Sequence, residues 1–156
     1  MGDFENAESL CRKAVEYATK DGHPVALSNA EMQYGIYFFY KREGKHAIEH
    51  IERCIEQAEK AGFEILVAQA QSLLGWAHNY LGEFERADEF ACRGIEMSMQ
   101  RGIEPQVPSM YLLRSLAQFF LGNEGKALRL IEEAVRLAKK MVKHFSKAHH
   151  APIGEE

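Results

Sequence analysis

The most obvious chemistry in the sequence is offered by two histidines and a glutamate in one short segment. His46, Glu49 and His50 match the H-x-x-E-H pattern of some zinc peptidases. A spacing of four residues places both imidazoles on one face of a helix, as metal ligation requires. A hydrolytic site would also need a third ligand and a cleft above that helix. We therefore interpret His46 and His50 as surface histidines and keep a metallohydrolase as the third of three functional hypotheses.

The three cysteines offer no further reactive site. Cys11, Cys54 and Cys92 form no closely spaced pair, and each falls inside a helical pattern. Such residues suit a reducing compartment, in which thiols stay free. The sequence also contains no phosphate-binding loop, no Ser-His-Asp order and no Cys-x-x-Cys pair. We expect a protein that is not an enzyme and that holds no metal or cofactor.

Composition places the chain among soluble, cytoplasmic proteins of one domain. Its 156 residues are 46% hydrophobic and 27% charged, and the net charge is −4. The longest apolar and aromatic run, 34–40, is about a third of a membrane span. Basic residues concentrate between Lys126 and Lys147, which suits a solvated terminal helix because cations favour a helix C-terminus. We expect neither a nucleic-acid nor a membrane partner, although this basic face leaves an acidic partner open.

The elements that position these residues follow from an internal repeat with a period of 40 residues. Small residues, turn glycines and aromatic residues recur in register when the sequence is shifted by that period. The aligned columns are Ala7, Ala47, Ala87 and Ala127; Ala14, Cys54, Gly94 and Ala134; Gly22, Gly62 and Gly102; Gly35, Gly75 and Ser115; and Tyr40, Tyr80 and Phe120. So many columns at one spacing indicate repeated structural units rather than chance.

Each unit has the pattern of two helices. Apolar residues after each turn follow the i, i+3, i+4, i+7 spacing of an amphipathic helix, and no segment alternates as a strand would. Gly22, Gly62 and Gly102 suit helix C-termini, while Pro24 and Pro105 suit the first turn of the next helix. The sequence therefore predicts a lone helix over 2–22, helix pairs over 24–62, 64–102 and 105–146, and a disordered tail over 147–156.

Small residues recur at the same positions of each repeat, and they predict where the two helices of a pair contact each other. Antiparallel helices approach closely only where the facing side chains are small. Ala47 and Cys54 lie seven residues apart and share one helix face, and Gly35 offers a notch on the partner helix. One pair cannot bury both of its faces, so neighbouring pairs must stack.

This pattern resembles the tetratricopeptide repeat (TPR). The third copy carries the family's features as Leu74-Gly75, Tyr80-Leu81-Gly82-Glu83-Phe84, Ala87, Ala91 and Gly94. The resemblance covers about residues 2–142 and implies an all-α fold, a right-handed α-solenoid of antiparallel helix pairs with about seven helices. Arg42 departs from the pattern at the turn glycine of the second copy, and Gly125 shifts the turn chemistry of the fourth. The 40-residue period, longer than the usual repeat, matches extended variants in signalling ATPases, transcriptional activators and scaffold proteins.

The position at which the first repeat begins indicates whether the chain is part of a longer array. Residue 2 falls at the turn between the two helices of a unit, so the chain opens with half a repeat. We expect a fragment of a longer array; the alternative is a short protein whose first helix acts as a cap.

The resemblance also implies a binding surface, because TPR proteins hold partners in the concave groove lined by the first helix of each pair. The groove positions of the second copy are Asn29, Met32, Gln33, Ile36, Phe39 and Tyr40. Those of the third are Gln69, Ser72, Leu73, Trp76, Asn79 and Tyr80, and those of the fourth are Ser109, Leu112, Leu113, Leu116, Phe119 and Phe120. An exposed apolar and aromatic surface of this size is typical of a binding site.

Trp76, at the centre of the middle repeat, is the predicted anchor, and burial in the core is the alternative for it. For Leu113 and Phe119 we favour the core. Some family members clamp acidic peptide tails with Lys and Asn, but Met32, Ile36 and Trp76 occupy comparable places here. An amphipathic helix or an apolar peptide is therefore the expected ligand.

Two functional hypotheses precede the metallohydrolase. The first is a protein–protein interaction module of a larger regulatory or signalling protein, with a protein or peptide partner. The second is homo-oligomerisation, in which the apolar groove or the open first helix contacts a second copy.

Overall fold

The computed structural model describes residues 4–102 and 104–149. Within these ranges the chain forms seven α-helices, one short 3-10 helix and no strand, so the all-α prediction and the helix count are confirmed. The helices are α1 (Phe4–Asp21), α2 (Pro24–Tyr40), α3 (Gly44–Lys60), α4 (Glu64–Tyr80), α5 (Phe84–Gln100), α6 (Val107–Phe120) and α7 (Glu124–His149), with the 3-10 helix η1 (Glu104–Gln106) before α6.

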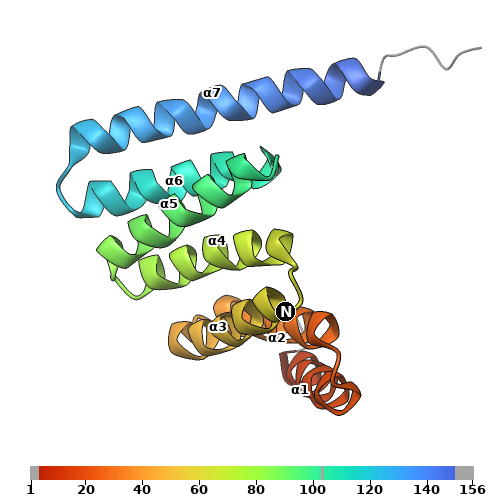
Figure 1. Cartoon of the computed structure of the whole chain (residues 1–156). Helices are drawn as coiled ribbons and strands as arrows, with labels where there is room; N and C mark the ends of the chain where they lie inside the picture. The colour runs from red at the N-terminus through yellow and green to blue at the C-terminus, as the bar shows by residue number, and fades with distance from the viewer. Residues whose placement is uncertain (1–3, 103, 150–156) are drawn as a thin grey trace, which may run out of the picture.

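The helices stack in chain order, from α1 at the bottom of Figure 1 to α7 at the top. Each helix packs against the next one along the chain, as expected for a solenoid of helix pairs. In addition α2 contacts α4, and α4 contacts α6. The first helices of the three pairs, α2, α4 and α6, are called A helices below, and α1, α3, α5 and α7 are called B helices.

Every connection between consecutive α-helices in the described chain contains one residue with a positive φ. The six angles lie between 62° and 80° and belong to Gly22, Arg42, Gly62, Gly82, Gly102 and Gly122. Glycine suits this left-handed conformation because it has no Cβ, and the turn lets the amide that follows bond back to the helix end. Gly122 occupies the repeat position of Gly82, so the prediction that Gly125 shifts the fourth turn is wrong.

The small-residue columns bring the two helices of a pair into close contact. A Cβ added to Gly35 would lie 2.7 Å from Cγ1 of Ile51 and 3.3 Å from the carbonyl oxygen of Ala47. Forty residues later, a Cβ on Gly75 would lie 3.3 Å from the carbonyl oxygen of Ala87. These glycines let an A helix approach the backbone of its B helix, as the repeat pattern predicts.

Two clusters of buried side chains form the core along the stack. One joins α2, α3 and α4 and includes Tyr37, Phe38, Ile51, Cys54 and Leu74. The other joins α5 and α6 and includes Ala87, Ala91, Ile95, Met110 and Leu113. Each cluster lies between a B helix and the A helices beside it, which is where stacking must bury apolar surface.

The ends of the fourth unit differ from the prediction. Pro105 lies in η1, and the α-helix begins only at Val107. At its other end, α7 continues to His149, so residues 147–149 are helical where a disordered tail was predicted. The rest of that tail lies outside the described residues. None of the described helices has the length and apolar character that crossing a membrane requires.

Candidate functional site

A groove of about 410 Å³ opens between α2 and α4 and reaches the start of α6. Direct contact of α2 with α4 forms its base, so the groove lies on the face of the A helices. Its walls consist of Asn29, Met32, Gln33, Ile36, Phe39, Tyr40, Leu66, Gln69, Ser72, Leu73, Trp76, Gln106 and Ser109.

Helical spacing explains why these side chains meet. On α2, Asn29, Gln33, Ile36 and Tyr40 recur at intervals of three or four residues and so share one face. The opposite face of α2 carries Gly35 and packs against α3. The pattern recurs on α4, where the groove residues face away from the contact with α5. Each A helix therefore binds its own partner helix with one face and lines the groove with another.

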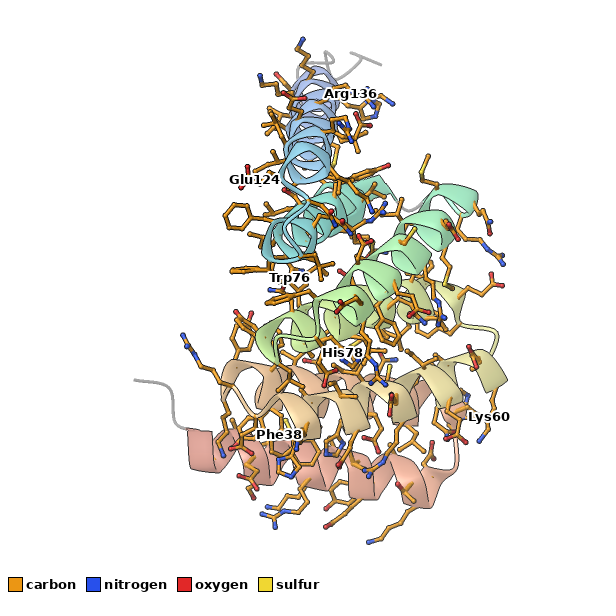
Figure 2. All side chains as sticks on the ribbon, turned by 90° about the vertical axis from the view of Figure 1, so that its left-hand side faces the viewer. Phe38, Lys60, Trp76, His78, Glu124 and Arg136 are labelled. Atoms are coloured by element: carbon orange, nitrogen blue, oxygen red, sulfur yellow. The ribbon has the colours of Figure 1, made fainter. Side chains whose placement is uncertain are left out.

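The groove combines an apolar floor with amide and hydroxyl groups. Met32 is only 5% exposed and belongs to the first buried cluster, so it forms part of the floor. Trp76 packs against the second cluster while lining the groove (Figure 2), and so combines the two roles considered for it. Amides of Asn29, Gln33, Gln69 and Gln106 supply hydrogen-bond donors and acceptors. Among the described residues that line the groove, none carries a charge.

Comparison with solved structures relates this arrangement to known folds. The TPR domain of Arabidopsis FLU superposes with a TM-score of 0.70 at 15% identity, over 72% of this chain and 95% of that domain. Aspartyl phosphate phosphatase F from Bacillus subtilis gives 0.81 at 19% identity, over 89% of this chain. The apo form of RapI gives 0.75 at 15% identity, over 94% of this chain. The chain therefore has a TPR-like helical-repeat fold.

The likeness concerns the TPR fold alone, because the sequence identities are low. The TPR-like chain corresponds to only 37% of the length of the phosphatase and 52% of that of RapI. No protein-family model matches the sequence, and no curated protein matches it either.

The groove is lined by all of the residues predicted for it in the second copy, and by some of those predicted in the third and fourth copies. All six second-copy residues line it, as do Gln69, Ser72, Leu73 and Trp76 of the third copy and Ser109 of the fourth. Asn79, Tyr80, Leu112, Leu116 and Phe120 do not belong to its walls. Tyr80 lies beside it, with its ring centroid 5.0 Å from that of Phe39, whereas Phe120 stacks on Phe84 at 4.7 Å.

The reason is the oblique course of the groove across the A helices. It follows α2 to its last residue, Tyr40, but leaves α4 at Trp76 and α6 at Ser109. Residues at the same repeat position therefore differ in whether they line the groove: Tyr40 does, whereas Tyr80 and Phe120 do not. The two residues assigned to the core also differ, because Leu113 is fully buried whereas Phe119 is 56% exposed, so that assignment of Phe119 is wrong.

Leu66 and Gln106 line the TPR groove although the sequence analysis did not select them. They stand at one repeat position, 40 residues apart, and each lies one helical turn before a selected residue. The signal that could have found them is therefore the repeat itself, extended by one turn towards the N-terminus of each A helix.

The histidine motif is held by two separate carboxylates. Nδ1 of His50 lies 2.6 Å from Oε2 of Glu31 on α2, and Glu31 is 5% exposed. Nδ1 of exposed His46 lies 3.1 Å from Oε2 of Glu43, whose pKa is lowered chiefly by its hydrogen bond with Lys41. Both imidazoles contact the ring of Phe38, with centroids 5.1 Å and 5.3 Å away. No group of three potential metal ligands occurs in the described part of the chain.

A second polar cluster, also missed from the sequence, joins three helices of the TPR array. Asp88 on α5 accepts hydrogen bonds from Nε of Arg114 at 2.7 Å and from the Gln118 amide at 2.8 Å. Its second oxygen lies 3.6 Å from Nζ of Lys126 on α7. These contacts connect residues 26 to 38 positions apart, and nothing in their spacing reveals them. They position α6 and lie outside the groove.

Proposed function

We propose that the groove binds a short, uncharged segment of another protein, so that the chain acts as an interaction module. The observation that carries this proposal is the groove's apolar floor, bordered by amides and hydroxyls without a charged side chain among its described walls. A charged ligand side chain buried there would lose its hydration without gaining a counter-ion, which is costly. An apolar segment would bury its side chains on Met32, Leu73 and Trp76.

Amide side chains suit the backbone of such a ligand. A bound segment exposes N–H and C=O groups that lose water, and each needs a new partner. Asn29, Gln33 and Gln69 each offer both a donor and an acceptor. The TPR-like neighbours support an interaction role in general, and we propose that the chain acts by binding rather than by catalysis.

Trp76 provides the test, because it is the only tryptophan in the sequence and lines the groove. A synthetic library of immobilised peptides would be probed with the protein, and the strongest ligands titrated while tryptophan emission is recorded. We expect the selected peptides to share an apolar stretch without Lys, Arg, Asp or Glu, and to shift the emission. Selection of peptides with charged central residues would refute the proposal.

Two pairs of variants sharpen this test. Trp76→Ala should weaken binding by about 2 kcal/mol or more, roughly thirtyfold. Met99→Ala should not, because Met99 is exposed and lines a separate hollow with Val107 and Leu137. Anisotropy of a labelled peptide would be measured here, since the tryptophan signal is lost. Gln69→Glu should weaken the same peptide because it introduces a charge into the groove. Gln100→Glu, at the exposed end of α5, is the matched control.

A further inference from the structure

The last described helix, α7, carries a stripe of exposed apolar side chains. Leu128, Ile131, Val135 and Val142 are 59%, 39%, 48% and 68% exposed, and Ala138 between them is exposed as well. Their spacing alternates between three and four residues, so they lie on one face of α7. These five residues are called the outer stripe. Figure 1 shows α7 as the outermost helix of the array.

Three of these five repeat positions are buried in α5. Ala91, Ile95 and Ser98 of α5 correspond to Ile131, Val135 and Ala138 and are 0%, 5% and 0% exposed. Ala91 and Ile95 belong to one buried cluster with Val107 and Met110 of the next A helix, α6, and Ser98 accepts a hydrogen bond of 2.8 Å from Gln106 in η1, directly before α6. The outer stripe is thus a surface of the kind that another helix covers elsewhere in the array.

The described chain does not return over the outer stripe. After α3 and α5 it turns at Gly62 and Gly102, and the next A helix follows. The corresponding residue in α7 is Val142, which lies inside the helix and extends the stripe. The helix continues to His149, through positions at which an A helix would otherwise begin.

The charges beside the outer stripe indicate which helix could cover it. Glu132 and Lys139 are exposed, stand seven residues apart and share the edge of the stripe away from α6. A second copy of α7 in antiparallel orientation would place Glu132 against Lys139 twice, once in each direction. In a parallel copy the same edge of each helix would lie on opposite sides of the contact, so Glu132 and Lys139 would not meet. Such flanking charges set the orientation of paired helices.

We propose that the outer stripe binds the outer stripe of a second copy of the chain, with the two α7 helices antiparallel. The contact is self-complementary and closes after two copies, as a two-fold dimer requires. It uses neither the groove nor α1, the surfaces considered for self-association from the sequence. The groove on α2, α4 and the start of α6 stays open, so the dimer and the proposed function can be tested separately.

Sedimentation equilibrium of the chain over a range of concentrations tests this dimer. We expect reversible dimerisation that Val135→Glu abolishes. Glu132→Lys and Lys139→Glu should each weaken the dimer by about tenfold, because attractive pairs become repulsive ones. The double variant Glu132→Lys/Lys139→Glu should recover wild-type affinity, since the charges are exchanged but remain complementary. Circular dichroism should show unchanged helix content, because all three positions are exposed.

Lys140→Glu is the matched control for these charge reversals. Lys140 lies on α7 next to Lys139 but borders a different hollow, with Val107 and Leu137, away from the outer stripe. It should leave the dimer affinity unchanged within about twofold. A monomer at the highest concentrations would overturn the proposal, as would a dimer that persists in Val135→Glu. A double reversal that fails to recover affinity would exclude the antiparallel arrangement.

Discussion

Ser115 donates a hydrogen bond from its hydroxyl group to the backbone carbonyl oxygen of Ala127, with the two oxygens 2.8 Å apart. In the two earlier pairs this position is Gly35 or Gly75, and the facing carbonyls are those of Ala47 and Ala87. The same crossing between an A helix and its B helix is therefore made in two ways. In two pairs a glycine lets the A helix approach the backbone carbonyl of the B helix without a side chain between them. In the last pair a serine hydroxyl donates a hydrogen bond to that carbonyl.

Replacing Ser115 by alanine should remove this bond at little change in volume. We expect the free energy of unfolding to fall by about 1 kcal/mol, the usual net value of such a bond. Urea unfolding followed by circular dichroism measures it. An unchanged midpoint would show that the hydroxyl contributes nothing to the crossing.

Gly35→Ala should lower stability relative to Gly125→Ala, although both replace a helical glycine by alanine. Gly125 has open surroundings, with the nearest contact of an added Cβ at 3.8 Å, so alanine should stabilise by up to about 1 kcal/mol. The Cβ at Gly35 would meet buried Ile51, and overpacking costs roughly 1–3 kcal/mol. Chemical denaturation of both variants should give this order, and the reverse order would contradict the close crossing.

Arg42→Gly should stabilise the protein by about 1 kcal/mol, because Arg42 has a φ of 62° in a conformation that disfavours side chains. Gly82→Ala should destabilise it by a similar amount. A Cβ at Gly82 meets nothing within 4 Å, so only the backbone conformation is tested there. Differential scanning calorimetry of the two variants should show shifts of opposite sign.

His50→Ala should be more harmful than His46→Ala. It leaves the carboxylate of Glu31 buried without its 2.6 Å partner, which should cost roughly 1–3 kcal/mol. His46 is exposed, and its loss should change stability by less than about 0.5 kcal/mol. Thermal unfolding with and without zinc completes the test. A zinc-dependent rise in Tm that both variants abolish would favour the metal hypothesis instead.

Cys54 should resist alkylation in the folded protein. Burial raises the pKa of its thiol to about 12, so little reactive thiolate exists at pH 8. The ordinary value is 9.0, and the folded state therefore holds this proton more tightly than the unfolded state. The resulting stabilisation is present below pH 9 and is lost as pH rises towards 12. Iodoacetamide labelling followed by mass spectrometry should modify Cys54 only upon unfolding.

The fold could be predicted because its determinants are local and repeated. The left-handed turns require glycine at five of six connections, and the crossings require small residues such as Ala47 and Gly35. Both requirements recur every 40 residues and so appear in the sequence. Arg42 is the exception: its conformation is imposed by the helices on either side rather than by its own preference.

The groove could be predicted only in part, because its direction depends on the angle between successive A helices. The spacing of apolar and polar residues along a helix determines which face of α2 or α4 is exposed. This spacing predicts the groove residues of α2, from Asn29 to Tyr40. It does not determine how far α4 and α6 are rotated, so the sequence could not show that Tyr80 and Phe120 lie outside the walls of this groove. The bond between Glu31 and His50 also joins separate helices, and no pattern along the chain reveals it.

The equal spacing of the left-handed turns also determines how such an array can change its length. Because each turn returns the chain in the same way, removal or duplication of 40 residues joins compatible helix ends. The crossing at Gly35, Gly75 or Ser115 would be reproduced in every added pair. Recombination within the gene could therefore lengthen or shorten the ligand-binding surface in steps of one helix pair while the rest of the architecture is preserved.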